Sequence, residues 1–319
     1  MAADLSVCIV NWNVKELLRQ CLQSIYRNTG GLQVEVVVVD NASHDGSADM
    51  VAQEFPHVVL QRNATNEGFA KGNNQAARLS SGPFLFFLNN DTIVQPEALS
   101  RLVVFLKQHP DVGMVGPRLI GRDGQPQRSY RPYPTLAASL HRLTSLRWTG
   151  LFRRAYKQYR RSPYDAPAAV QVEALLGAAV CLPRQVFFDC GGWDEGYFFG
   201  VEDLDLSIRV AKTHNLMFCP QAEIIHLGRM SSRCNSGFTY TGVECGYARF
   251  LRKHVIGPLG SAGYKMLVTL NLPLTLGVNL VQEGWRRLRH GPAQAGWPHS
   301  ELQAVWHFAT RGLPVFWRA

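Results

Sequence analysis

The sequence lacks the cysteine pattern of a disulfide framework or of a zinc site. Its 319 residues include seven cysteines, an odd number, and no two of them form a Cys-x-x-Cys pair. Disulfide-dense secreted domains and structural zinc sites both need regularly spaced cysteines. The scattered cysteines therefore argue against both classes and suit a protein of a reducing cytosol.

A leader-like N-terminus and a long uninterrupted apolar run are also missing. The chain runs almost directly into an apolar strand at 5–10, so no signal peptide is expected, and the sequons at Asn41 and Asn63 are expected to be silent. The most apolar stretch, 266–281, contains asparagine, proline and glycine and is shorter than the roughly 20 residues that span a bilayer. Tryptophan and arginine follow it, which favours an interfacial membrane contact, while a core helix or an oligomer interface stays open.

Acidic residues are almost absent from the segment 117–161. Eleven lysines and arginines stand there against Asp123 alone, and they account for the net charge of +9. The basic residues alternate with tyrosine, tryptophan and phenylalanine. Such a segment is expected to attract phosphate or an anionic membrane surface, with single-stranded nucleic acid as the competing interpretation.

Residues 1–116 contain a regular alternation of strand and helix patterns. The β-branched run at 34–39 predicts a parallel strand buried on both faces, and 14–26 has apolar residues at helical spacing. The alternation predicts an α/β fold with a doubly wound sheet. Further along, one return strand is expected over 170–182, a short strand over 222–226 and a helix over 240–254.

Polar residues follow each of the first four expected strands. They are Asn11 and Asn13, Asp40 and Asn41, Asn63 and Asn66, and Asn89 to Asp91. Ligands of doubly wound sheets lie beyond the carboxyl ends of the strands. The pattern therefore predicts that these residues line one crevice.

Five carboxylates occur within twelve residues, 194–205, among apolar and aromatic neighbours. Glu202 and Asp203 stand where a helix pattern begins, behind a glycine-rich aromatic loop. A carboxylate in this position is well placed to take a proton from a bound hydroxyl. It can equally cap the helix and complement its dipole, and the residues by themselves leave both interpretations open.

Six segments in order resemble the inverting family-2 glycosyltransferases, which have the GT-A fold, and most closely their bacterial rhamnosyltransferase-like branch. The segments are 10–13, 39–47, 66–74, 88–92, 191–209 and 226–231. The resemblance covers roughly residues 5–255. It implies a GT-A, mixed and mostly parallel sheet flanked by helices. Residues 1–116 are then the nucleotide-sugar-binding half and 117–258 the acceptor-binding and catalytic half. Residues 259–319 lie beyond the resemblance and are expected to form a helical C-terminal extension that can associate with a membrane.

The resemblance also implies which residues bind the donor nucleotide. Asp40 corresponds to the residue that accepts the N3–H of uracil or thymine. Gly68 is expected to allow close approach or a positive φ, and Lys71 to neutralise the diphosphate. The other nucleotide-binding residues implied are Asn11, Asn13, Asn66, Asn89, Asn90 and Arg229.

A divalent cation is implied at Asn89-Asn90-Asp91, which stands where the family has its Asp-x-Asp motif. Asn89 replaces the first acid, so only Asp91 supplies a carboxylate. His226 corresponds to the histidine that completes the metal site, although a lone histidine at a strand end is more often a polar cap. Mg²⁺ or Mn²⁺ suits these ligands, and its role is to stabilise charge on the leaving diphosphate.

Asp203 corresponds to the general base of the family, and Trp193, Asp194 and Glu202 are expected to bind the acceptor. Trp193 either offers a face to a sugar ring or closes its own loop.

The function implied is inverting transfer of a sugar, with rhamnose favoured, from a dTDP- or UDP-sugar. The acceptor is a hydroxyl of a cell-surface polysaccharide precursor carried on a polyprenyl diphosphate. The protein is expected to be cytoplasmic and peripheral on the inner face of the plasma membrane, without a nucleic-acid partner; oligomer formation is left open.

Two other classes of protein compete with this interpretation. A nucleotidyltransferase would usually carry a glycine-rich phosphate loop after the first strand, and Asn11-Trp12-Asn13 does not resemble one. A catalytically degenerate sugar- or nucleotide-binding protein, acting as a membrane-bound assembly partner, is the main alternative. The presence of Asp40, Asp91, Asp203 and His226 argues against it.

Overall fold

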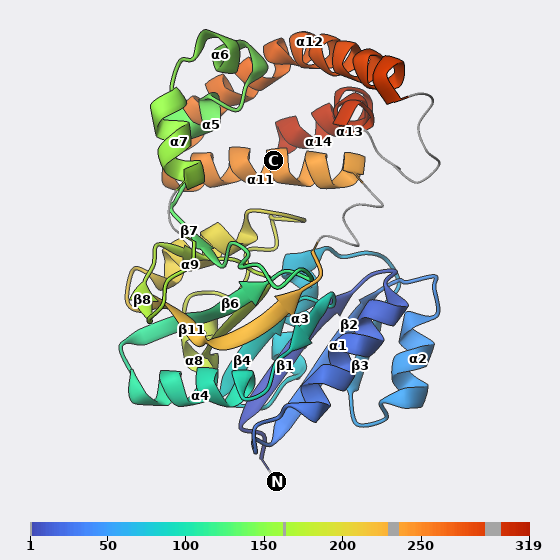
Figure 1. Cartoon of the computed structure of the whole chain (residues 1–319), viewed down its shortest axis with the longest axis vertical. Coiled ribbons are helices and arrows are strands. Elements are labelled where there is room, and N and C mark those ends of the chain that lie inside the picture. The colour runs from blue at the N-terminus through green and yellow to red at the C-terminus, as the bar shows by residue number, and fades with distance from the viewer. Residues whose placement is uncertain (1, 162–163, 229–235, 291–300) are drawn as a thin grey trace. The chain divides into compact units, whose positions relative to one another are not determined.

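The valine-rich segment at 34–39 lies in a strand that is buried on both faces, as expected. A computed structural model describes residues 2–161, 164–228, 236–290 and 301–319 (Figure 1). The chain divides into two units. The α/β unit comprises 1–133, 163–198 and 202–230, and the helical unit comprises 134–162, 199–201 and 231–319.

The α/β unit is built on a mixed, mostly parallel sheet, which confirms the predicted fold class. Over the described residues its strand order is β3-β2-β1-β4-β10-β6-β11-β5, and β8 also pairs with β11. The parallel neighbours on one side are β1 (Leu5–Asn11), β2 (Val34–Asn41), β3 (Val59–Asn63) and β4 (Phe84–Leu88). The other strands are β5 (Thr92–Val94), β6 (Val112–Ile120), β8 (Val170–Gln171), β10 (Ala179–Pro183) and β11 (Asn215–His226).

Helices cover both faces of this sheet (Figure 1). One hydrophobic cluster joins the sheet to α1 (Lys15–Arg27), α2 (Ser47–Glu54) and α4 (Ala98–Gln108). A second cluster on the other face joins it to α3 (Phe69–Leu79), α8 (Arg184–Asp189) and α9 (Glu202–Val210). In β2 the side chains of Val36 and Val38 lie in the first cluster and those of Val37 and Val39 in the second. Side chains alternate along a strand, so a continuous valine run fills both cores.

The expectation of one return strand over 170–182 is wrong. The segment forms three short strands with different partners: β8 pairs with β11, β9 (Ala174–Leu175) pairs with β7 (Tyr130–Arg131), and β10 lies antiparallel to β4. The carboxylate of Glu173, just before β9, accepts a hydrogen bond from the backbone N–H of Tyr133, just after β7, at 2.8 Å. This bond joins the two strands of the small β7–β9 sheet at one end. Residues 170–182 therefore form three strand pairings, because the segment passes from one sheet to the other and back.

The helical unit consists of two groups of helices packed around one core. The first group is α5 (Leu136–Leu140), α6 (Thr144–Thr149) and α7 (Arg153–Arg161). The second is α11 (Ser236–His254), α12 (Gly257–His290), α13 (Glu301–His307), the π-helical turn η1 (Phe308–Gly312) and α14 (Leu313–Arg318). Their buried apolar side chains form a separate cluster that includes Tyr264, Phe308 and Phe316.

The apolar tail is part of a longer helix than the sequence pattern indicated. Helix α12 has 34 residues and continues through Pro273. Within the described residues, one stretch, Gly257–Trp285, has the length and composition to cross a membrane, and only 22% of its most apolar window is buried. The interruptions at asparagine, proline and glycine do not end the helix.

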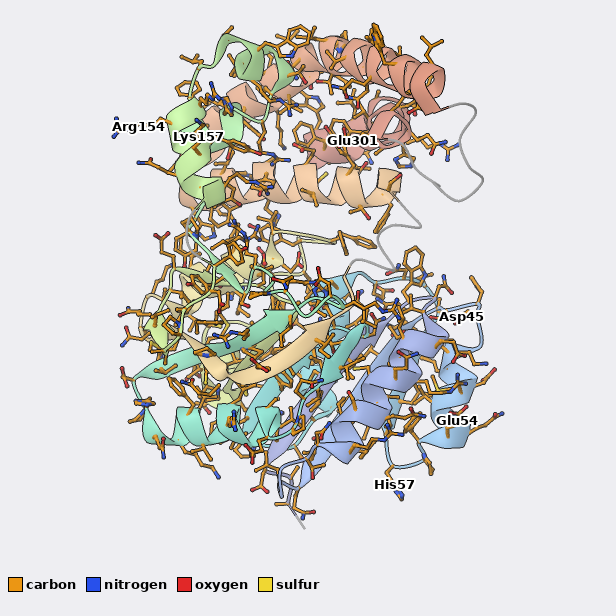
Figure 2. The ribbon with its side chains drawn as sticks, in the orientation of Figure 1. Asp45, Glu54, His57, Arg154, Lys157 and Glu301 are labelled. Carbon is orange, nitrogen blue, oxygen red and sulfur yellow. The ribbon has the colours of Figure 1, made fainter. Side chains whose placement is uncertain are left out.

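The basic residues of 117–161 are divided between the two units, and several are paired with acids. Arg118 bonds to Asp165 and Glu223, at 2.9 and 3.3 Å. Arg142 pairs with Glu244. By contrast, Arg154 and Lys157 are exposed on α7 and point away from the helical unit (Figure 2). Part of the charge excess is thus neutralised inside the fold.

The six cysteines within the described residues are all free thiols. Cys234 lies outside the described residues.

Candidate functional site

Side chains at the carboxyl ends of three neighbouring strands are linked by hydrogen bonds. The amide nitrogen of Asn11 donates to Asp40 Oδ1 at 2.9 Å, and the amide oxygen of Asn11 accepts from Asn90 Nδ2 at 3.0 Å. The second carboxylate oxygen of Asp40 accepts from the backbone N–H of Ser43 at 2.9 Å. All of these side chains except that of Ser43 are buried. The structure therefore brings the first, second and fourth strand ends into one polar network, because parallel strands end at the same edge.

A second set of contacts orders the loops above these strands. Asn13 has φ +53° and accepts a hydrogen bond from the backbone N–H of His44 at 2.7 Å. Asn66 Oδ1 accepts from Asn41 Nδ2 at 3.2 Å and from the backbone N–H of Gly68 at 3.0 Å. These asparagines hold backbone in place, which is the chemistry expected of turn residues.

Gly68 occupies a position that a side chain would obstruct. Its φ is +82°, and a Cβ there would lie 2.7 Å from the carbonyl oxygen of Phe198. The next residue, Phe69, donates its backbone N–H to the same carbonyl at 3.1 Å. Positive φ and close approach are both present, as the sequence led us to expect. Lys71, one turn into α3, is bonded to the carboxylate of Glu67.

Asp91 and His226 lie side by side at the ends of β4 and β11, with His226 Nε2 3.5 Å from Asp91 Oδ1. The backbone N–H of Leu227 also donates to the carbonyl oxygen of Asp91 at 2.9 Å. On the other side of the ring, His226 Nδ1 is 2.9 Å from Gln127 Oε1, and Gln127 Nε2 donates to the carbonyl oxygen of His226 at 3.0 Å.

The Gln127 contacts assign the protons of the His226 ring. Because the amide nitrogen of Gln127 donates to a carbonyl, its amide oxygen must accept from Nδ1–H of His226. Nε2 then faces Asp91, and in the neutral ring it carries the lone pair that a metal would need. A hydrogen bond that orients the far nitrogen of a histidine is a regular feature of metal ligation.

Asp91 and His226 fit a divalent cation as two of its ligands. Magnesium is usually bound by one or two protein ligands, with substrate phosphates and waters supplying the rest. Among the described residues, no cluster of three or more histidine, cysteine, aspartate or glutamate side chains is suited to a metal. Asn89 is used mainly through its backbone, donating N–H to Ala178 at 2.9 Å and accepting from Thr92 Oγ1 at 2.7 Å.

Asp203 lies in the first turn of α9, and its two carboxylate oxygens have different surroundings. Oδ1 accepts from Arg131 Nη2 at 2.7 Å and from the backbone N–H of Leu204 at 2.9 Å. Oδ2 is 3.4 Å from the backbone N–H of Gly177. Oδ1 is thus held by two short bonds, while Oδ2 keeps the capacity to accept another proton.

The neighbouring carboxylates have other roles. Asp205 is fully buried and bonds to Arg209 at 2.8 Å, so it supports the helix. Glu195 accepts from Asn74 at 2.9 Å. Asp194 accepts from the backbone N–H of Gly196 at 2.9 Å and closes a turn, while Glu202 is buried at the start of α9. The five carboxylates of 194–205 therefore do not act as one acidic cluster.

Trp193 is only 1% exposed. Its ring packs edge-on against Phe69 and Phe87, at centroid distances of 5.5 and 5.3 Å. The indole N–H is buried and has no hydrogen-bond partner among the described residues. In this conformation the ring offers no face to a sugar, and its one polar group, the indole N–H, is buried.

Three site residues were not singled out from the sequence. Ser43 and Gln127 carried no separate signal, because a serine in a turn and a glutamine in a loop are common. Arg131 was visible only as one of eleven basic residues. Arg229, expected to bind the donor diphosphate, lies outside the described residues.

Comparisons with known proteins agree with this arrangement. Residues 6–166 match the model of the family described as Glycosyl transferase family 2. An N-acetylglucosaminyl-diphospho-decaprenol L-rhamnosyltransferase of Mycobacterium tuberculosis is 29% identical over 207 residues, 60% of this chain and 66% of the relative. The O-antigen biosynthesis protein RfbC of Myxococcus xanthus is 27% identical over 80% of this chain and 19% of its own length. This chain thus spans less than two thirds of each of these relatives.

Solved structures share the fold. The mannosyltransferase PcManGT from Pyrobaculum calidifontis, in complex with GDP-Man and Mn²⁺, matches with a TM-score of 0.52 at 16% identity, over 100% of this chain and 87% of that chain. GalNAc-T7 with UDP, GalNAc and Mn²⁺ matches with a TM-score of 0.53 at 18% identity, over 70% and 43%. The α/β unit and its helical extension therefore have the GT-A architecture.

Proposed function

The chain belongs to glycosyl transferase family 2, and we propose that it transfers a sugar, rhamnose in the first instance, from a dTDP- or UDP-sugar with inversion. The acceptor is a hydroxyl of a polysaccharide precursor carried on a polyprenyl diphosphate. The observation that carries the proposal is the placement of Asp203, in the first turn of α9, with one oxygen fixed and the other able to accept a proton. The name of the rhamnosyltransferase relative supports the choice of sugar and acceptor.

The donor nucleotide is assigned to the polar network at the strand ends. Asp40 is held by Asn11 and by the backbone of Ser43, which fixes its carboxylate for the N3–H of a pyrimidine base. Each carboxylate oxygen can accept two hydrogen bonds and accepts one from these partners, so both retain capacity for a further donor. Asn13, Asn66, Asn90 and Gly68 shape the loops around the nucleotide.

Asp91 and His226 are assigned to a divalent cation, Mg²⁺ or Mn²⁺, with Gln127 orienting the histidine. When bound, such an ion stabilises the negative charge that grows on the leaving diphosphate. Asn89 in place of a second carboxylate leaves the pair dependent on the donor's own phosphate oxygens for further ligands.

Asp203 carries the proton transfer. Its Oδ2 takes the proton of the acceptor hydroxyl as that oxygen attacks the anomeric carbon, and the bond from the anomeric carbon to the diphosphate breaks on the opposite side. Arg131 and the N–H of Leu204 hold Oδ1 throughout. Glu202, Asp194 and the indole N–H of Trp193 are the nearby groups assigned to orient the acceptor.

The helical unit is assigned to contact with the cytoplasmic face of an anionic membrane. Helix α12 carries a stripe of exposed apolar residues at helical spacing: Leu259, Leu267, Leu270, Leu274, Val281, Trp285 and Leu288. A helix with an exposed apolar face and basic neighbours is suited to lie in the interface of a bilayer. Exposed basic residues on α7, including Arg154 and Lys157, supply attraction to anionic lipid.

The test is a donor and acceptor panel. The purified chain is incubated with Mn²⁺ or Mg²⁺, a set of dTDP- and UDP-sugars, and polyprenyl-diphosphate-linked saccharides. Release of nucleoside diphosphate and the mass of the glycolipid product are both measured. We expect turnover that needs one donor, the metal and the lipid-linked acceptor.

An Asp203→Asn variant is compared with Asp189→Asn, which changes an exposed aspartate on α8. The first should lose about 10²–10⁴-fold in turnover and the second should not. Nucleotide binding without turnover on any donor would favour the degenerate binding protein. Failure to bind any uridine or thymidine nucleotide would overturn the transferase proposal.

A further inference from the structure

Two adjoining cavities within the helical unit are lined by both polar and apolar side chains. The inner one has a volume of about 250 Å³ and lies among α6, α11, α12 and α13. The outer one has a volume of about 280 Å³ and opens beside Trp148 and Gln282. They share four lining residues: Thr144, Arg147, Asn279 and Glu301. We call the two together the polar cleft.

The positive and negative charges of the side chains that line the polar cleft are equal in number. Arg142 pairs with Glu244, and Arg147 and Glu301 add one charge of each sign. Figure 2 labels Glu301 at the start of α13. Burial, followed by the nearby Glu244 carboxylate, raises the pKa of the Tyr264 phenol well above its usual range. The cleft is therefore close to neutral overall, which does not favour a phosphate or another strong anion.

Some hydrogen-bonding capacity in the polar cleft is not used by the fold. Arg142 Nη1 is buried and has no partner among the described residues. Asn279 donates from Nδ2 to the carbonyl oxygen of Thr275 at 2.8 Å, and its Oδ1 accepts from no residue that the structure describes. Of these two groups only Arg142 Nη1 is buried, and leaving a buried polar group unpaired is unfavourable. Such groups at a cavity wall are suited to a polar ligand.

Other polar residues of the cleft have structural partners, and they fix its walls. Asn271 Oδ1 accepts from the backbone N–H of Ser145 at 2.9 Å, and the Thr144 and Thr275 hydroxyls are 2.9 Å apart. These bonds join the start of α6 to the middle of α12. The cleft is thereby preformed, as small-molecule sites usually are.

Trp148 gives the outer cavity an aromatic wall. Its side chain is 65% exposed although it lines the cavity. A large ring held open to solvent beside amides and hydroxyls matches the ligand sites in which aromatic faces pack on the apolar face of a polar ligand.

We propose that the polar cleft binds a neutral saccharide, which, resting on the function proposed above, is a sugar of the lipid-linked acceptor other than the one whose hydroxyl reacts at Asp203. Helix α12 supports this assignment because it carries two different faces. Tyr264, Asn271, Thr275 and Asn279 line the cleft, while Leu270 and the other residues of the apolar stripe are exposed on another face. One helix thus offers a polar site for a sugar and an apolar contact for a membrane.

The test measures binding without turnover. N-acetylglucosamine, its β-1,4-linked disaccharide chitobiose, rhamnose and inorganic phosphate are titrated into the full chain, with saturation-transfer NMR and Trp fluorescence as readouts. We expect at least one of the neutral sugars to bind and phosphate not to compete with it. Trp148→Ala and Asn279→Leu should each weaken that binding on the order of tenfold.

Trp306→Ala is the matched control, because Trp306 is 61% exposed in the same unit and lines neither cavity. UDP and dTDP binding is measured on every variant and should not change. If no neutral sugar binds, if phosphate displaces the sugar, or if Trp148→Ala and Asn279→Leu bind like the wild type, the cleft proposal is wrong. None of those results affects donor turnover, so the proposed transferase activity is judged separately by the donor panel.

Discussion

Arg131 Nη2 donates to Asp203 Oδ1 at 2.7 Å, so an arginine of the small β7–β9 sheet fixes the carboxylate proposed as the general base. Both side chains are largely buried, at 17% and 10% exposure. A buried ion pair is rarely needed for stability, and breaking one leaves an uncompensated charge. Its value here is positional, because it holds Oδ1 and leaves Oδ2 of Asp203 as the oxygen proposed to take the proton.

Arg131→Met should lower kcat by about 10²-fold, since a misplaced catalytic group loses rate steeply. The KM for the donor should stay near its wild-type value because Arg131 bonds to Asp203, which is proposed to act on the acceptor and not on the donor nucleotide. Steady-state kinetics and a thermal melt on the same preparation separate a catalytic loss from unfolding.

Arg131→Lys keeps the charge and should recover part of the lost kcat. Arg128→Met is the control, since Arg128 lies over the Tyr164 ring at 5.6 Å and is not paired with Asp203 in any contact that the structure describes. A wild-type kcat in Arg131→Met would remove Arg131 from the mechanism.

Gln127→Leu should weaken Mn²⁺ binding by about 10–100-fold, as loss of an orienting partner of a metal histidine does. The physical reason is that His226 loses the acceptor that fixes its ring and its tautomer. Electron paramagnetic resonance of free Mn²⁺, with and without UDP, measures the affinity independently of turnover. Gln125→Leu changes an exposed glutamine two residues away and should bind the metal like the wild type; equal affinities in the two variants would refute the assignment.

Most of the site residues could be placed from the sequence because they follow strands. A parallel strand delivers its last side chains to a common edge, so Asn11, Asp40 and Asn90 had to come near one another once the strands were recognised. Gln127 and Arg131 could not be found in this way. They come from the segment after β6, whose path depends on tertiary pairing rather than on local periodicity.

Asp40→Asn should weaken UDP and dTDP binding by about 10–100-fold, because a charge-assisted hydrogen bond contributes about 1.5–3 kcal/mol. The substitution keeps the size of the side chain but removes the charge that the pyrimidine N–H would meet. Calorimetric titration measures the effect, with Asp49→Asn on the exposed face of α2 as the control. Unchanged binding of both nucleotides in Asp40→Asn would show that Asp40 does not bind the pyrimidine base.

The described thiols should react slowly with Ellman's reagent in the folded protein. Burial raises the pKa of Cys21 to about 12 and that of Cys245 to about 11. The thiolate is the reactive form, so a raised pKa leaves little of it at pH 8, and reactivity should rise only as the pH approaches those values. We expect rapid labelling of no more than Cys234 before denaturation; fast reaction of any described cysteine in the native state would contradict this.

The elements of the fold could be predicted where a local sequence pattern defines them. They could not be predicted where they depend on contacts distant in the sequence. The strand expected before Asn89 to Asp91 is β4, Phe84–Leu88, a short run of aromatic and leucine residues. The segment 136–161 forms three short helices that its many arginines had obscured, and Arg142 is partly buried there, paired with Glu244. An arginine is predicted to lie on the surface unless its acidic partner is known. The partner of Arg142 is about a hundred residues away in the sequence, so local patterns do not reveal it.

The apolar stripe of α12 is proposed to contact a membrane, and this contact can be tested. Leu270 is 70% exposed at the middle of the stripe, where a lipid surface would cover it. Burial of one leucine contributes about 1.5–3 kcal/mol, so Leu270→Glu should lower partitioning onto phosphatidylglycerol vesicles by about tenfold or more.

Vesicle flotation at low and high salt measures this partitioning, and the basic residues of α7 should make it salt-sensitive. Leu79→Glu, at a leucine 45% exposed in the α/β unit, is the matched control and should float like the wild type. Equal flotation of wild type and Leu270→Glu would mean that the stripe does not meet the membrane. The polar cleft lies on a different face of α12 from the stripe. That result would therefore not contradict the saccharide site, but it would remove the proposed connection between the site and the bilayer.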